Sequence, residues 1–205
     1  VHHVYTVGAR SVGPVAPRVT YNAEAAWQWG HRGVESIAAT AMHAELGWQT
    51  GDRRRDPALS VEYNYGSGDT NPADGRHGSF DELYPAGFNR FGMSDAIAWI
   101  NSHNAMAVGE WTLGRRWQVA GGYRSTWVAH RADALYFSPV STLAVNPGAR
   151  SSHVGQEVFV GGTWRMAGEF RLAFGYARFH RGGYLKSIEG VRGMSTPYVS
   201  LETRF

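Results

Sequence analysis

Apolar and polar residues alternate along most of this chain, and strict alternation places two kinds of side chain on opposite faces of a β-strand. The last eight residues, YVSLETRF, put Val199, Leu201 and Phe205 on one face and Glu202 and Arg204 on the other. The same pattern predicts about nine strands in an all-β, antiparallel protein. They cover residues 4–12, 19–30, 37–49, 59–65, 104–113, 117–131, 157–165, 170–177 and 198–205.

Composition excludes several other classes of protein. The chain has no apolar run near the roughly 20 residues that a spanning helix needs. It has no cysteine, which excludes disulfides and thiolate chemistry. Its 20 basic and 17 acidic residues give no basic excess of the kind that nucleic-acid binding requires. No P-loop, dinucleotide fingerprint or nucleophile elbow is present, so we expect no enzyme.

The polar face carries many charged residues in mid-strand, which a dry interior would not tolerate. Facing a water-filled lumen, they fit a transmembrane β-barrel whose other face meets lipid, with tryptophans near the strand ends. A soluble two-sheet sandwich is the alternative. The charged residues predicted to face the lumen are Arg10, Glu24, Glu45, Glu62, Glu110, Arg124, Glu157, Arg165, Arg171, Glu202 and Arg204.

Connection lengths predict an orientation. In outer-membrane barrels short turns are periplasmic and long loops extracellular. The long segments are 66–100, 133–152 and 181–197, and the short ones 13–18, 51–57, 114–116 and 167–169. The last strand then runs toward the periplasm. With nine strands the first runs the same way, so either the count is wrong by one or the single domain of residues 1–205 is the carboxy-terminal half of a larger barrel.

Several segments together resemble the alginate export family of outer-membrane proteins. They are YTVGAR at 5–10, YNAEAAWQWG at 21–30, HAELGW at 43–48, VEYNYGSGDTNPADGRHGSFDELYP at 61–85, ADALY at 132–136 and HVGQEV at 153–158. The resemblance implies half of a monomeric eighteen-stranded barrel in the bacterial outer membrane. It also implies an anionic or polar solute, since the best understood member secretes an anionic polysaccharide through an arginine-lined lumen. The terminal phenylalanine resembles the signal that the barrel assembly machinery reads.

Three pairings among the lumen residues are predicted. The 114–117 turn would place Glu110 opposite Arg124 as a cross-strand ion pair. Arg165 and Arg171 would face each other, which is costly unless a third group or a transported anion intervenes. Glu24, Glu45 and Glu62 would fall in register on three successive strands as a structural network.

A cation site is the remaining candidate. Asp69, Asn71 and Asp74, with Asp81 following, offer oxygen ligands of the kind that calcium prefers, although without the spacing of a loop that ends in a bidentate glutamate. Asx turns are the alternative. The histidines lack metal-ligand spacing and fall toward the outer strand ends, at positions 31, 77, 103, 130, 153 and 180. A channel is therefore the favoured function and a structural barrel that docks an envelope complex is the alternative. An outer-membrane enzyme is a third candidate, but no catalytic constellation can be identified in the sequence.

Overall fold

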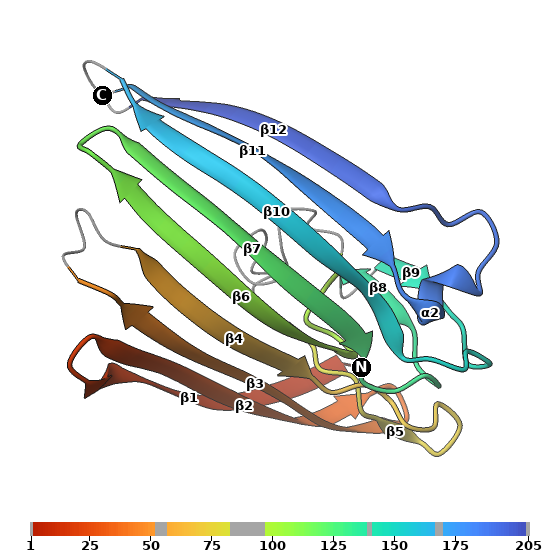
Figure 1. The fold of residues 1–205 in the computed structure, drawn as a ribbon. Coiled ribbons are helices and arrows are strands. Elements are labelled where there is room, and N and C mark those ends of the chain that lie inside the picture. Colours follow the sequence, from red (N-terminus) through yellow and green to blue (C-terminus); the bar gives the residue numbers. More distant parts are fainter. Residues whose placement is uncertain (1, 52–56, 83–96, 139–140, 167–169, 204–205) are drawn as a thin grey trace.

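Consecutive long strands lie side by side in one curved antiparallel sheet, which forms an open trough (Figure 1). The computed structural model describes residues 2–51, 57–82, 97–138, 141–166 and 170–203. The order along the sheet is β1-β2-β3-β4-β6-β7-β10-β11-β12, which confirms the nine predicted strands. Their bounds are β1 His2–Ala16, β2 Val19–Arg32, β3 Glu35–Gln49, β4 Ala58–Gly66, β6 Ser102–Leu113, β7 Trp117–Val128, β10 His153–Arg165, β11 Phe170–Arg181 and β12 Met194–Thr203.

Four small elements lie within the long connections. A two-residue strand, β5 (Arg76–His77), pairs in parallel with β3. The segment after β7 contains a separate hairpin of β8 (Leu135–Ser138) and β9 (Ser141–Ala144). A one-turn helix, α2 (Gly183–Lys186), follows β11. These connections therefore carry structure of their own.

Two prolines lie inside strands where the sequence predicted loops. Pro14 belongs to β1, beside an irregularity in the pairing between Pro14 and Ala16, and Pro197 belongs to β12 opposite Tyr176. β1 and β12 are the two edge strands of the sheet. An edge strand uses only one side of its hydrogen-bonding groups, so it tolerates a residue without an N–H. The predicted ends of both strands were wrong for this reason.

The two faces of the sheet differ in exposure as the alternation predicts. On β3, Ala39, Ala41 and His43 are buried, whereas Met42 and Leu46 on the other face are exposed. We call the face of His43 the inner face and the opposite one the outer face. Seven of the eight tryptophans lie on the outer face near strand ends: Trp27, Trp29, Trp48, Trp111, Trp117, Trp127 and Trp164.

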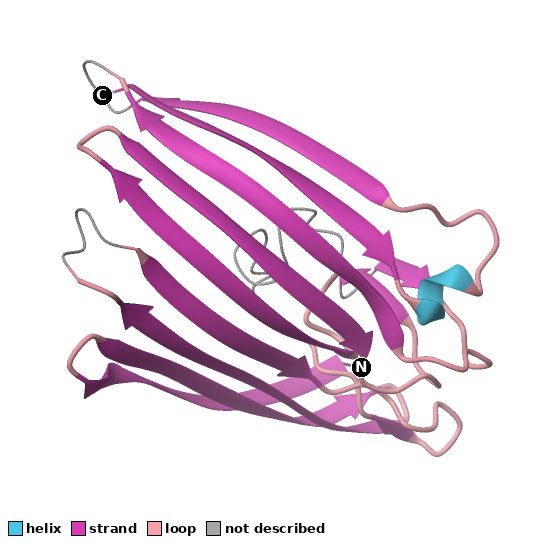
Figure 2. Cartoon of the chain, viewed as in Figure 1, coloured by secondary structure: helices cyan, strands magenta, loops and turns pink. Residues whose placement is uncertain are grey.

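The long connections lie at one end of the sheet, opposite the carboxy-terminal end (Figure 2). Two buried apolar clusters join residues of these connections to the strands. One joins Val128 and Phe179 to Leu135, Tyr184 and neighbouring loop residues. The other seats Phe80 and Trp99 on the inner face of β3. The described parts of the long connections therefore pack as a layer over this end of the inner face.

Closure of the sheet is not observed. Nine consecutive antiparallel strands make β1 and β12 run in the same direction, and no pairing joins them in the described parts of the chain. Among the described residues, no helix is long and apolar enough to cross a membrane.

Candidate functional site: the polar inner face

The pairing registers bring the predicted lumen residues to one face. Residues directly opposite in a sheet share a face, and every second residue along a strand does too. Arg10 faces Glu24, Glu45 faces Glu62, and Arg124 faces Glu157. Following these pairs from strand to strand places Arg10, Glu24, Glu45, Glu62, Glu110, Arg124, Glu157, Arg165, Arg171 and Glu202 all on the inner face. The eleventh, Arg204, lies outside the described residues.

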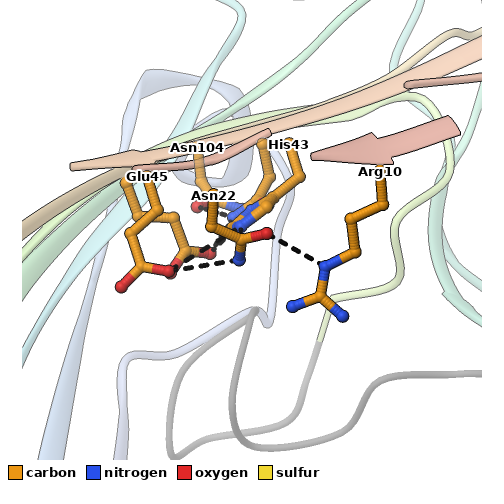
Figure 3. Close-up of polar contacts among 7 residues, drawn as sticks. Arg10, Asn22, His43, Glu45 and Asn104 are labelled. Atoms are coloured by element: carbon orange, nitrogen blue, oxygen red, sulfur yellow. Dashed lines mark hydrogen bonds and ion pairs between the residues drawn. The ribbon is translucent and has the colours of Figure 1, made fainter. Parts of the chain in front are cut away.

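A hydrogen-bonded network crosses the inner face from β1 to β6, centred on His43 (Figure 3). The Nδ2 group of Asn22 lies 2.9 Å from His43 Nε2 and 3.3 Å from Glu45 Oε2. On the other side of the ring, His43 Nδ1 lies 2.8 Å from Asn64 Oδ1. Since an amide nitrogen donates and an amide oxygen accepts, these partners place the imidazole proton on Nδ1.

Both ends of this network reach further strands. Arg10 Nε donates to Asn22 Oδ1 at 3.0 Å, and Asn64 Nδ2 donates to Asn104 Oδ1 at 3.2 Å. His43, Asn64 and Asn104 are almost completely buried. These hydrogen bonds join side chains of neighbouring strands from β1 to β6 and stiffen this part of the sheet, although Asn104 Nδ2 has no hydrogen-bond partner in the described part of the chain.

The predicted row of three glutamates is partly wrong. Glu45 and Glu62 are directly opposite, as predicted, and His43 lies between their carboxylates, at 3.9 Å from Glu45 and 3.6 Å from Glu62. Glu24 is instead opposite His43 on one side and Arg10 on the other. This two-residue offset could not be predicted from the alternation of residues along β2 and β3. It depends on which residues form the turn between the two strands.

The predicted Glu110–Arg124 pair is wrong. The turn after β6 is tight, so Glu110 faces Ala120 and Arg124 faces Met106. The partner of Arg124 comes from the other side, where its Nη2 lies 3.5 Å from Glu157 Oε1. Arg124 is 1% exposed and Glu157 0%, so this is a buried ion pair in the middle of the wall.

The predicted Arg165–Arg171 juxtaposition is confirmed. Glu202 supplies the third group, because its Oε2 lies 3.8 Å from Arg171 Nη1. Arg171 and Glu202 are about half exposed, so solvent screens this pair. Three of the four described arginine candidates therefore lie beside a glutamate. Positive and negative side chains thus alternate along the inner face.

A loop is fixed to the inner face by Gln28 of β2. The side-chain amide of Gln28 donates to the carbonyl oxygen of Asp81 at 2.7 Å and accepts from the Asp81 amide at 2.8 Å. Gln28 is fully buried. Phe80 and Trp99 also pack on β3. This packing and the double hydrogen bond hold the 79–82 segment against the inner face, at the end of the sheet that carries the long connections.

Asp133 joins three loop segments. One carboxylate oxygen accepts from the Asp69 amide at 2.9 Å and from Ser79 Oγ at 2.6 Å. The other accepts from the Ala134 amide and from Tyr136 Oη, both at 2.7 Å. Burial, together with the neighbouring Asp133, raises the pKa of the Tyr136 phenol far above its usual range.

In the candidate calcium loop, side-chain oxygen atoms accept hydrogen bonds from backbone amides of the same loop. Asp69 Oδ1 accepts from the Asn71 amide at 2.9 Å, and Asp74 Oδ1 accepts from the Arg76 amide at 2.9 Å. Asn71 Oδ1 accepts from the Ala73 amide at 3.2 Å. These are the Asx turns of the alternative prediction. In the described ranges no three His, Asp or Glu side chains gather as metal ligands, and calcium stays a prediction.

Sequence reasoning missed two groups of inner-face residues. No network was predicted among four polar residues, although the alternation of each strand puts them on the same face as the glutamates: Asn22, His43, Asn64 and Asn104. Phe159 was overlooked because an aromatic residue breaks the polar pattern at its position. The histidines lie near the long-connection end, as predicted, and His103 and His153 flank Trp127 with ring centroids 5.2 and 5.5 Å away.

The structure therefore defines an all-β protein built on one antiparallel sheet of long strands, with an apolar outer face and a charged, hydrogen-bonded inner face. The model of the family described as "Alginate export" matches residues 2–197. The chain therefore belongs to the alginate export family. No curated protein matches it.

Proposed function

We propose that this chain forms part of the wall of an outer-membrane channel that exports an anionic or polar solute or lets it diffuse. The observation that supports the proposal most directly is the division of the sheet into an exposed apolar face and a charged face. Lipid would cover the first and water the second. Membership of the alginate export family makes an anionic polysaccharide such as alginate the leading candidate for the solute. No catalytic role is proposed.

The nine strands would form about half of an eighteen-stranded barrel. β1 and β12 run in the same direction, so direct pairing between them would join parallel strands in an otherwise antiparallel wall. Additional strands between the two edges would close the barrel without a parallel pair. The barrel would be monomeric, with outer-membrane lipid around it and the barrel assembly machinery as a transient partner of the last strand.

The alternating charges shape what such a wall would do. Arg10, Arg124 and Arg171 each lie beside a glutamate, so an anion would meet weak, separated sites rather than one continuous basic track. Conduction requires sites that bind weakly enough to release the solute. Arg165 and Arg171 remain the best candidates for a site that touches a transported anion.

Planar-bilayer recordings of the full-length protein test the channel. We expect ohmic conductance steps, and we expect neutralisation of Arg165 and Arg171 together to lower anion over cation permeability. An unchanged reversal potential would remove these two residues from the pathway. Correctly folded protein that gives no conductance would overturn the channel itself.

One observation favours a second function, a structural barrel that docks an envelope complex. The β8–β9 hairpin and the residue after it expose Phe137, Leu143 and Val145. Exposed apolar side chains grouped on one hairpin suit a protein interface. Folded protein without conductance, together with a partner retained through this hairpin, would favour that function.

A further inference from the structure

Two aromatic side chains interrupt the polar inner face near its short-turn end. Phe159 lies an even number of residues from Glu157 and Arg165 on β10, so it shares the inner face with them. Tyr198 shares that face with Glu202 on β12 for the same reason. Both are partly exposed. Other aromatic residues of these two strands and of β11 face outward, apart from Phe179, which is buried in the loop cluster. Phe159 and Tyr198 therefore do not belong to the buried cluster that contains Phe179.

Each of these rings lies over a glycine of the adjacent strand. A Cβ atom at Gly122 of β7 would come within 2.5 Å of Phe159 Cζ. A Cβ atom at Gly175 of β11 would have the Cε1, Cζ and hydroxyl oxygen of Tyr198 within 2.9 Å. Because these glycines have no side chain, both rings can lie against the inner face of the sheet instead of projecting away from it. A ring held in this way presents an apolar surface to whatever passes along the inner face.

Polar groups surround these rings. A hollow of about 260 Å³ is lined by Phe159 and Tyr198 together with Glu110, Gln118, Thr163 and Arg171. Its floor includes Ala120 and Gly161, which leave room above the sheet. The lining thus combines aromatic surface, a carboxylate, an amide, a hydroxyl and a guanidinium that is about half exposed.

The spacing of the rings suits an extended ligand. Phe159 lies in the same row as Ala177, and Tyr198 lies in the next row, opposite Gly175. Their strands are separated by β11, so the two Cα atoms are about 10 Å apart across the sheet and about 7 Å along it. Small residues occupy the wall between them. One elongated molecule could contact both rings.

We propose that Phe159 and Tyr198, with their polar lining, form a subsite for pyranose rings of a saccharide chain. A pyranose has an apolar C–H face that packs on an aromatic ring, and a rim of hydroxyls that hydrogen-bonds with carboxylate, amide and guanidinium groups. Pockets of this mixed character orient a ligand by a few polar groups around apolar contact. The proposal rests on the proposed function, since it assigns the class of solute that the channel would carry. The alternative is that the rings only cover the glycines beneath them.

The test uses the full-length protein in detergent and in planar bilayers, with a neutral glucose hexasaccharide and a mannuronate hexasaccharide as probes. Calorimetric titration measures binding, and block of the single-channel current measures occupancy of the channel. The variants are Phe159→Leu, Tyr198→Leu and Tyr198→Phe. Tyr176→Leu, on the outer face of β11, is the matched control.

We expect one or both probes to bind, and each Leu variant to weaken binding about tenfold. Tyr198→Phe, which keeps the ring, and Tyr176→Leu should bind as the unmodified protein does. Tighter binding of the mannuronate would indicate that Arg171 contacts its carboxylate groups. Equal binding of the two probes would indicate that contact between the pyranose faces and the aromatic rings determines recognition.

The two proposals fail separately. Open channels with no binding of either hexasaccharide would overturn the subsite and leave the channel. Binding that depends on Phe159 and Tyr198 without any conductance would keep the subsite and overturn the channel. Unchanged affinity in folded Leu variants would show that the rings only cover Gly122 and Gly175.

Discussion

At the scale of single residues, Gln28 connects the wall to the loop that covers it. Its side chain satisfies both the N–H and the C=O of Asp81, and it also donates to Thr6 Oγ1 at 3.2 Å. No short side chain at this position could replace the double hydrogen bond. The loop would then lose the partners of two part-buried backbone groups, which costs at most about 1–3 kcal/mol for each group.

Gln28→Ala should therefore release the 79–82 segment without unfolding the strands. We expect faster hydrogen exchange at the Asp81 amide, measured by mass spectrometry. Gln118→Ala is the control, because Gln118 is an exposed residue on the same face at the opposite end of the sheet. Equal exchange at Asp81 in both variants and in the unmodified protein would show that apolar packing of Phe80 alone holds the loop.

Two arginine–glutamate ion pairs of the inner face should differ in strength. Arg124 and Glu157 are buried, whereas Arg171 and Glu202 are about half exposed. Glu157→Gln leaves the buried Arg124 guanidinium without this carboxylate, so it should lower the free energy of unfolding by about 3 kcal/mol or more. Glu202→Gln should lower it by less than about 1 kcal/mol, because solvent screens that pair.

Urea unfolding of both variants in the same detergent measures this difference. Double variants that also replace the arginine by methionine provide the coupling energy of each pair. Similar losses for the two glutamates would mean that other contacts of Arg124 compensate when Glu157 loses its charge.

At the scale of elements, the loop layer depends on protonation at Tyr136 of β8. Burial and the hydrogen bond to Asp133 raise the pKa of this phenol above the usual value of 10.0. A pKa raised by folding means that the neutral form is favoured in the folded state. The associated stability is therefore complete below about pH 10, and it is lost as pH rises toward the folded-state pKa.

Absorbance at 295 nm follows phenolate formation and tests this. The difference between the unmodified protein and Tyr136→Phe should show one phenol that ionises only above the range of exposed tyrosines. Release of the loops should accompany it, seen as new protease cleavage in the 129–138 segment above pH 10. A difference curve centred near pH 10 would contradict the burial of this hydroxyl group.

The strands could be predicted from the sequence because alternation is a local property of each segment. Their ends could not be predicted at Pro14 and Pro197, because tolerance of proline depends on being at the edge of the sheet. Nor could the Arg124–Glu157 pair, because β7 and β10 are joined by a long connection, whose length does not fix the register between the two strands. The folding of Phe80 and Trp99 onto β3 is also nonlocal, and periodicity says nothing about it.

At the scale of the whole molecule, the orientation of the wall follows from its connections. The connections after β4, β7 and β11 are long and meet at one end of the sheet, where the β2–β3 turn also lies (Figure 2). The β6–β7 turn lies at the other end, near the carboxy terminus (Figure 1). With long loops facing the medium and short turns facing the periplasm, the two ends should differ in access from outside the cell.

Residues 1–205 contain no cysteine, so single thiols engineered into this part of the chain can report its orientation. Val34 in the β2–β3 turn is 99% exposed, and Arg115 in the β6–β7 turn is exposed at the opposite end. In intact cells, a membrane-impermeant maleimide should label Val34→Cys and leave Arg115→Cys unlabelled until the outer membrane is permeabilised. Labelling of Arg115→Cys alone from outside would reverse the orientation, and equal labelling of both in intact cells would contradict a wall that spans the membrane.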